Sequence, residues 1–310
     1  MAAAVVALLA TGCTKDDNQK VNDGRIKIFA EGMTAAGGNT KLLVDPANLT
    51  GKNGIQWKAG ETVNLNGTSL PITGNTTDGY TIDPEGVDPA LAGDAYYAIY
   101  PGNTFGDDGN SWTVTNGKNT NPSSITLISL NIKFRDGGKH DIVFPMATKI
   151  EDGATEMQFK HLTAGFRMTL HDAKTSDVSL TQIKVYVYGT PGDAAGTPIA
   201  SQIDGMNCNV KWANEGPMIP IQDVGQVPDD EPAYGSEMVF NLYDGDVAGV
   251  NIAAGDDLTF CIPVTLATVK KIAVVGYNNG TKVFTKISSM TSSVAIERNK
   301  MYSVKSIDIN

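Results

Sequence analysis

The chain has 310 residues, a formal net charge of -10 and a hydrophobic content of 41%. This length suits one large domain or two ordinary ones, and the hydrophobic content is sufficient for buried cores. Nucleic acids and anionic membrane surfaces are bound through basic patches, so the acidic balance argues against both as partners.

The first element is an apolar stretch, residues 2–10, that leads through Thr11 and Gly12 to Cys13. It is shorter than the roughly 20 residues that cross a bilayer, but it suits the apolar core of an export signal. Small residues before a cysteine, with the polar run 14–20 directly after it, have the form of a bacterial lipoprotein signal. We therefore expect Cys13 to carry acyl chains that anchor the exported protein at the surface of the outer membrane.

One feature of an export signal is missing, because no Lys or Arg precedes Cys13. We interpret Met1 as an internal or wrongly assigned start. The alternative is a buried N-terminal strand or helix with a chance cysteine.

After this region the sequence alternates between apolar and polar residues, which indicates half-buried strands. In the run 164–170, for example, Ala164, Phe166, Met168 and Leu170 share one face. No segment shows sustained helical periodicity outside the signal, so we predict an all-β fold. The expected strands are 25–29, 95–100, 124–130, 164–170, 182–188, 237–243, 258–264, 270–277, 281–287 and 302–309.

Turn signals separate these runs, and Asn279-Gly280 between two apolar runs is a strong hairpin signal. Many short strands with regular turns favour a β-sandwich or a closed β-sheet, and the length suggests two such units in series. We place the boundary in the polar turn 151–154. The predicted parts are a lipoprotein signal and tether at 1–24, an N-terminal β-sandwich at 25–154 and a C-terminal β-sandwich at 155–310.

Cys208 and Cys261 are the other two cysteines. In an exported protein they could form a disulfide, which would close a loop of roughly 50 residues and contribute about 4 kcal/mol. Two separate buried thiols are the simpler interpretation, since sequence alone does not place their Cα atoms within bonding range.

Signatures of catalysis are absent from the sequence: it has no Gly-x-Ser-x-Gly, no His-Glu-x-x-His, no Walker-type loop and no dinucleotide-binding glycine motif. In His140-Asp141 and His171-Asp172 the neighbouring side chains would point to opposite faces of a strand. His161, which we place at a strand start, is expected to be a structural hydrogen-bonding residue. The acidic turns 107–110 and 244–246 lack the ligand spacing of calcium loops. We therefore expect a non-enzyme without metal or cofactor.

Three tryptophans, Trp57, Trp112 and Trp212, could stack sugar rings if they lay together on the surface, although such residues are more often part of a core or edge. They are the basis of an alternative function, a lipid-anchored surface glycan-binding protein that serves carbohydrate uptake.

Several segments, in this order along the chain, resemble motifs of the fimbrillin family, the pilins and pilus-associated lipoproteins of Bacteroides-type bacteria. They are Ile55–Val63 with Trp57, Gly60 and Glu61, Tyr97–Pro101, Phe144–Ala147 followed by Met157–Ala164, Phe260–Val264 and Arg298–Val304.

The resemblance implies two transthyretin-like β-sandwich domains and a structural or adhesive role in a cell-surface fimbrium. It also implies assembly with other fimbrial subunits by strand exchange, in which a protease removes an N-terminal strand after an Arg and a neighbour's extended segment fills the groove. A host or bacterial surface ligand would be a further partner.

Arg25 is the candidate processing site, because it is the only Arg before residue 135. It stands at the start of the first predicted strand, so cleavage after it would remove a polar tether and leave the strand. No obvious extra donor segment follows the strand 302–309. Both features favour a tip or anchor role over a stalk role. The strand 302–309 could still act as the donor segment, which leaves a stalk role open.

Overall fold

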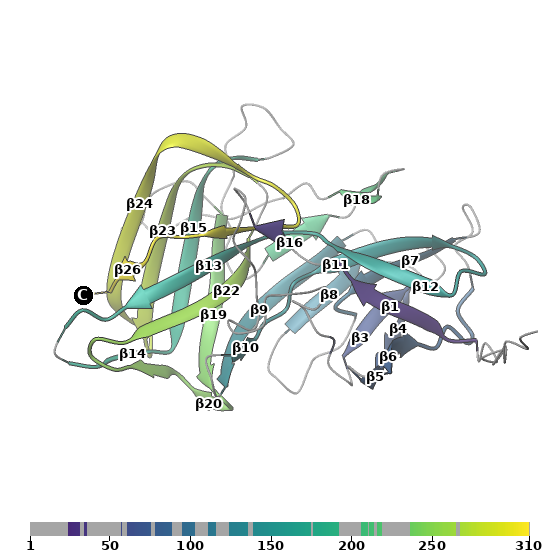
Figure 1. Cartoon of the computed structure of the whole chain (residues 1–310), viewed down its shortest axis with the longest axis horizontal. Coiled ribbons are helices and arrows are strands. Elements are labelled where there is room, and N and C mark those ends of the chain that lie inside the picture. The colour runs from purple at the N-terminus through teal and green to yellow at the C-terminus, as the bar shows by residue number, and fades with distance from the viewer. Residues whose placement is uncertain are drawn as a thin grey trace, which may run out of the picture.

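The computed structural model of the chain shows a molecule built from strands and turns (Figure 1). The residues that it describes are 24–31, 34–35, 57, 61–75, 78–88, 95–102, 111–115, 124–135, 139–174, 176–191, 206–209, 211–213, 216–218, 236–264 and 267–309. None of these residues is helical, so the prediction of an all-β fold is confirmed.

One group of eight strands, here called the first sandwich, lies in the right-hand half of Figure 1. Its strands are β1 (Ile26–Ala30), β3 (Thr62–Leu65), β4 (Thr68–Pro71), β5 (Thr73–Asn75), β6 (Gly79–Ile82), β7 (Ala95–Tyr100), β11 (Met146–Glu151) and β12 (Glu156–His161). They pair in the order β4-β3-β7-β11-β12-β1-β6-β5.

The two strands at the ends of this order, β4 and β5, are separated in sequence only by Ile72. One extended segment therefore pairs with β3 along its first part and with β6 along its second. Such a corner strand folds the sheet back on itself into two facing layers. Ile72 is only 1% exposed, so the corner is fixed by a buried side chain.

Most of the remaining strands form the second sandwich, whose C-terminal strands lie in the left-hand half of Figure 1. One sheet has the order β10-β9-β19-β15-β23-β24, with β8 and β16 also paired to β9 and β20 to β19; the other has the order β2-β25-β13-β22, with β26 paired to β13. The strands of the first sheet are β8 (Ser111–Thr115), β9 (Ser124–Arg135), β10 (Lys139–Asp141), β15 (Gln182–Pro191), β16 (Met206–Asn209), β19 (Ser236–Asp244), β20 (Val247–Ala248), β23 (Ala267–Asn278) and β24 (Thr281–Ile296). Those of the second are β2 (Thr34–Ala35), β13 (Ala164–His171), β22 (Asp257–Val264), β25 (Lys300–Ser303) and β26 (Ile307–Asp308).

Two small pairs complete the strands: β14 (Val178–Leu180) with β21 (Val250–Ile252), and β17 (Lys211–Ala213) with β18 (Gly216–Met218). Buried side chains of both sandwiches belong to one continuous hydrophobic cluster.

The predicted alternation in β13 is confirmed, since its four apolar residues at even positions, 164 to 170, are each at most 1% exposed. The predicted hairpin is also present: Asn279 (φ 48°) and Gly280 (φ 79°) connect β23 to β24 in the left-handed conformation that such a two-residue turn requires. The predicted last strand is divided into β25 and β26, which both pair with β13.

The predicted domain boundary falls in the turn between β11 and β12, two strands that pair with each other. The chain leaves the first sandwich after β12 and enters the second at β13. However, β9 precedes that point and pairs with β19 of the second sandwich. A tandem division at residue 154 and the transthyretin-like subtype therefore stay predictions.

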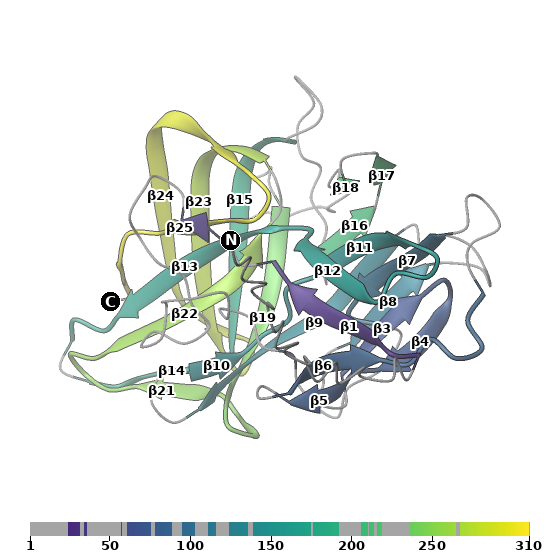
Figure 2. The same ribbon diagram turned by 45° about the vertical axis from the view of Figure 1, so that its right-hand side comes forward.

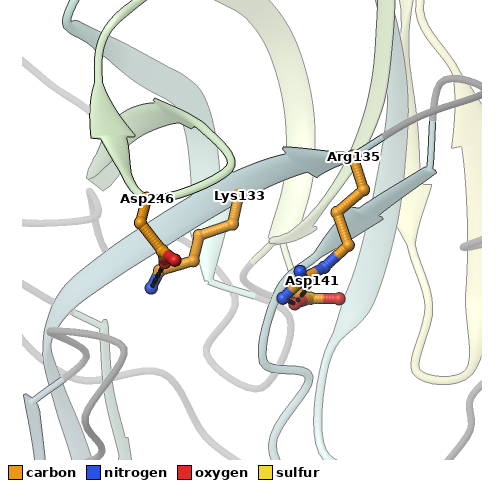
Figure 3. A network of polar contacts seen from close by, with 4 residues as sticks. All are labelled: Lys133, Arg135, Asp141 and Asp246. Carbon is orange, nitrogen blue, oxygen red and sulfur yellow. Dashed lines mark hydrogen bonds and ion pairs between the residues drawn. The ribbon is translucent and has the colours of Figure 1, made fainter.

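Polar contacts order the hairpin of β9 and β10 (Figure 3). Lys133 Nζ lies 3.0 Å from the carboxylate of Asp246, and Arg135 donates to Asp141 through Nε at 2.8 Å and through Nη2. Exposed ion pairs contribute little to stability. The pair of Arg135 joins β9 to β10, and the pair of Lys133 joins β9 to the turn between β19 and β20. Between Arg135 and Asp141 in this hairpin lies His140, whose buried ring contacts the backbone of β22.

Candidate strand-exchange site

The first strand, β1, lies inside a sheet layer and not at its edge. It pairs in parallel with β12 over four residue positions and antiparallel with β6 over three. Figure 2 shows β1 running between these two strands. A strand in this position satisfies backbone groups of two neighbours, so its departure would leave two facing rows of unpaired donors and acceptors.

The sequence of β1 explains how it is held. Ile26 and Ile28 point into the core and are 4% and 2% exposed, whereas Phe29 on the other face is 46% exposed. Burial of each isoleucine side chain contributes roughly 1.5–3 kcal/mol. Without β1, the site would therefore be an apolar slot that fits a strand with two apolar residues spaced by two.

Arg25 is exposed and stands directly before β1. A cut after Arg25 would separate residues 1–25 from the strand and leave β1 in the sheet. As a candidate processing site, Arg25 therefore lies where cleavage changes the covalent anchoring of the strand and not its pairing.

Glu31, directly after β1, makes three contacts that fix the end of the strand. Its N–H donates to the carbonyl of Phe159 at 2.8 Å, and its own carbonyl accepts from Nε2 of His161 at 2.9 Å. Its carboxylate accepts from Nη1 of Arg298 at 2.8 Å, and the same nitrogen donates to the carbonyl of His161 at 2.9 Å. We call Glu31, His161 and Arg298 the Glu31 junction.

The electrostatics of His161 follow from its burial. The pKa of His161 is lowered to about 4, mainly by burial and in smaller part by the nearby guanidinium of Arg298, although the hydrogen bond to Glu31 opposes the shift. Nδ1 of the ring has no hydrogen-bond partner among the described residues, so an added proton there would be unsatisfied. The ring is therefore neutral at pH 7. His161 has the structural role that we expected, but it ends β12 and does not start a strand.

The other two histidines have separate environments. Nε2 of His140 lies 2.9 Å from the backbone nitrogen of Cys261, and burial lowers the pKa of this histidine. His171 contacts Asp257 at 2.7 Å across the pair of β13 and β22. The described residues contain no group of three or more His, Cys, Asp or Glu that could hold a metal ion.

The cysteines give no reactive centre in the described part. Cys261 is 3% exposed, and burial raises its pKa to about 12, so its thiol is protonated at neutral pH. Cys13 and the side chain of Cys208 lie outside the described residues, so lipidation and the disulfide stay predictions.

One of the three tryptophans is not available for a surface site that stacks sugar rings. Trp57 is 6% exposed and makes edge contacts with Tyr100 and Phe159, at 4.8 and 5.3 Å between ring centroids, so it belongs to the core. The side chains of Trp112 and Trp212 lie outside the described residues, as does the acidic turn 107–110. In the other acidic turn, Asp246 pairs with Lys133.

Sequence reasoning missed the contact between Glu31 and Arg298, which lie 267 positions apart. Arg298 stands in one of the segments that resemble fimbrillins, whereas nothing in the local sequence marks Glu31. Within the described residues no helix is long and apolar enough to span a membrane.

No family model and no curated protein matches this chain. Among solved structures, a candidate cell adhesion protein from Bacteroides ovatus shares 13% identity at a TM-score of 0.39, with 90% of this chain and 91% of that one covered. A candidate cell adhesion protein from Bacteroides fragilis shares 12% identity at a TM-score of 0.38, with the same coverage. A fimbrial protein from Bacteroides ovatus shares 10% identity at a TM-score of 0.30, with 93% of this chain matched to 49% of that one.

Proposed function

We propose that this protein is a structural or adhesive subunit of a cell-surface fimbrium, exported as a lipoprotein and joined to other subunits by strand exchange. The observation that supports this most is the internal position of β1, held between β12 and β6 by two buried isoleucines. A vacated position of this kind accepts an extended segment of another chain through main-chain hydrogen bonds and apolar contacts. A head-to-tail contact of this type repeats from subunit to subunit.

The position of Arg25 supports a tip or anchor role over a stalk role within this proposal. Cleavage after Arg25 would leave β1 paired, so the acceptor would open only when a partner displaces the strand. The buried Trp57 gives no support to the alternative of a glycan-binding surface.

Treatment of the purified protein with an Arg-specific protease tests assembly. If the chain polymerises, the protease should release residues up to Arg25, and the product should give ladders on denaturing gels when samples are not boiled. An Arg25→Lys variant, treated identically, should stay intact at this position, and its gel shows whether a ladder depends on the cut. A processed product that remains monomeric at high concentration would count against a polymerising subunit.

The anchor is tested by a Cys13→Ser variant expressed in a bacterium that processes lipoproteins. Serine cannot carry the thioether-linked lipid, so the variant should lose its acyl label and leave the membrane fraction, because a multiply acylated cysteine is the source of stable attachment. A Cys208→Ser variant should remain labelled and membrane-bound. Unchanged membrane retention of the Cys13→Ser variant would refute the lipoprotein assignment.

A further inference from the structure

The two described strands nearest the N-terminus, β1 and β2, pair with different sandwiches. β1 belongs to the first sandwich, whereas β2, a few residues later, pairs in parallel with β25 of the second. In Figure 1 the purple segment accordingly appears twice, as β1 within the right-hand group and again beside the yellow C-terminal part. We call β1, Glu31 and β2, residues 26–31 and 34–35, the strap.

The Glu31 junction lies between these two pairings and adds a side-chain contact to each. On one side, Glu31 and His161 connect the end of β1 to the end of β12. On the other side, Arg298 belongs to the turn between β24 and β25. Both charged side chains are partly buried, 22% exposed for Glu31 and 31% for Arg298, so their ion pair is less screened by water than a fully exposed one.

The turn that contains Arg298 sets the start of β25. The next residue, Asn299, has a φ of 60° and donates its N–H to the carbonyl of Thr163 at 3.1 Å. Met301 then packs over Gly165 so closely that a Cβ at Gly165 would lie 2.8 Å from the methionine sulfur. A displacement of this turn would therefore change the packing of Met301 against Gly165, which holds β25 against β13.

Among the described strands, β25 has two neighbours, β13 on one side and the two-residue strand β2 on the other. Departure of the strap would remove β2 from one side of β25 and the carboxylate of Glu31 from Arg298. The same event would empty the position between β12 and β6 in the first sandwich.

We propose that the strap couples the two sandwiches. Arg298 is the positioning residue, because its ion pair with Glu31 forms only while the strap is in place. Release of β1 opens the acceptor position in the first sandwich and loosens the C-terminal segment 298–309 from β13 in the second. This inference deepens the proposed function, on which its biological role rests, because strand exchange needs an open acceptor in one subunit and an extended segment from another.

Hydrogen exchange followed by mass spectrometry on the monomeric full chain tests the coupling. A Glu31→Gln variant keeps the shape of the side chain and removes its charge, so amides in 298–309 should exchange about tenfold faster than in the wild type, given what hydrogen bonds to charged groups contribute. An Asp141→Asn variant, which removes a carboxylate from Arg135 at a different place (Figure 3), should leave this segment unchanged. Unchanged exchange in 298–309 of the Glu31→Gln variant would overturn the proposal.

Coupling must also act in the reverse direction, because linkage between two sites is reciprocal. A Met301→Ala variant loosens β25 and should therefore raise exchange in residues 27–31, although it touches none of them. Met238→Ala removes an equally buried methionine from β19 and should leave residues 27–31 protected. Equal effects of the two substitutions would show general destabilisation and would refute a specific strap. Since these measurements use monomers, a failure to form ladders after proteolysis bears on the proposed function and not on the coupling.

Discussion

A chain that starts at residue 36 should fail to close the first sandwich, and a synthetic peptide of residues 24–35 should restore it. The shortened chain loses the two isoleucines that β1 buries, which together contribute roughly 3–6 kcal/mol. It also leaves backbone groups of β12 and β6 without partners. Since domains are stable by only about 5–15 kcal/mol, this loss should expose apolar surface and promote aggregation.

The measurement is the unfolding transition of the shortened chain with and without an excess of peptide. The peptide should raise the transition temperature in a concentration-dependent way, since a ligand that binds only the folded state stabilises it by mass action. A control peptide with serine in place of Ile26 and Ile28 keeps the length and charge and should have little effect. Equal effects of the two peptides, or full stability of the shortened chain alone, would contradict an acceptor slot at β1.

Acidification from pH 7 to pH 4 should destabilise the protein, and His161 should account for about 3 kcal/mol of the loss, since one pKa unit corresponds to about 1.4 kcal/mol. The pKa of His161 is lowered from 6.5 to about 4 in the folded chain. Between these values the unfolded chain binds a proton that the folded chain excludes, so stability falls with pH. The contribution is fully present above about pH 6.5 and is lost by about pH 4.

The ring contacts the backbone carbonyl of Glu31, lies near the guanidinium of Arg298 and packs against the ring of Phe144 at 6.0 Å between centroids. A His161→Gln variant retains a donor for the carbonyl but cannot titrate. Its free energy of unfolding, measured by denaturant titration, should therefore depend less on pH between 7 and 4. The difference in free energy of unfolding between the wild type and the variant at pH 8 gives the cost of the substitution itself. Parallel curves for the two proteins over this range would show that His161 does not titrate as expected.

The sequence predicts strands well where one face is buried and poorly where neither face is. The apolar positions of β13 alternate because that strand covers the core. In contrast, β24 runs along the end of its sheet, with only Phe284 and Ile296 buried among its described side chains. Its Ser- and Thr-rich second half therefore shows no alternation, and the strand is much longer than the predicted run 281–287.

The candidate site could likewise be predicted only in part from the sequence. The composition of β1 predicted a half-buried strand after Arg25, because alternation is a local property of the chain. Its place between β12 and β6 depends on pairing with strands far along the sequence. The Glu31 junction depends on the same long-range order, since a single carboxylate and a single guanidinium carry no local signal of their partner.

The corner at Ile72 has a consequence for uncontrolled association between copies of this chain. Because residues 68–75 supply both ends of the order of strands, six of the eight strands have a neighbour on each side, and only the short corner strands β4 and β5 have one described partner each. Unpaired edges are what allow sheets of different molecules to associate without control. Among the described strands of this half, the unpaired edge is therefore confined to two short strands of four and three residues, which offer another chain little backbone to pair with.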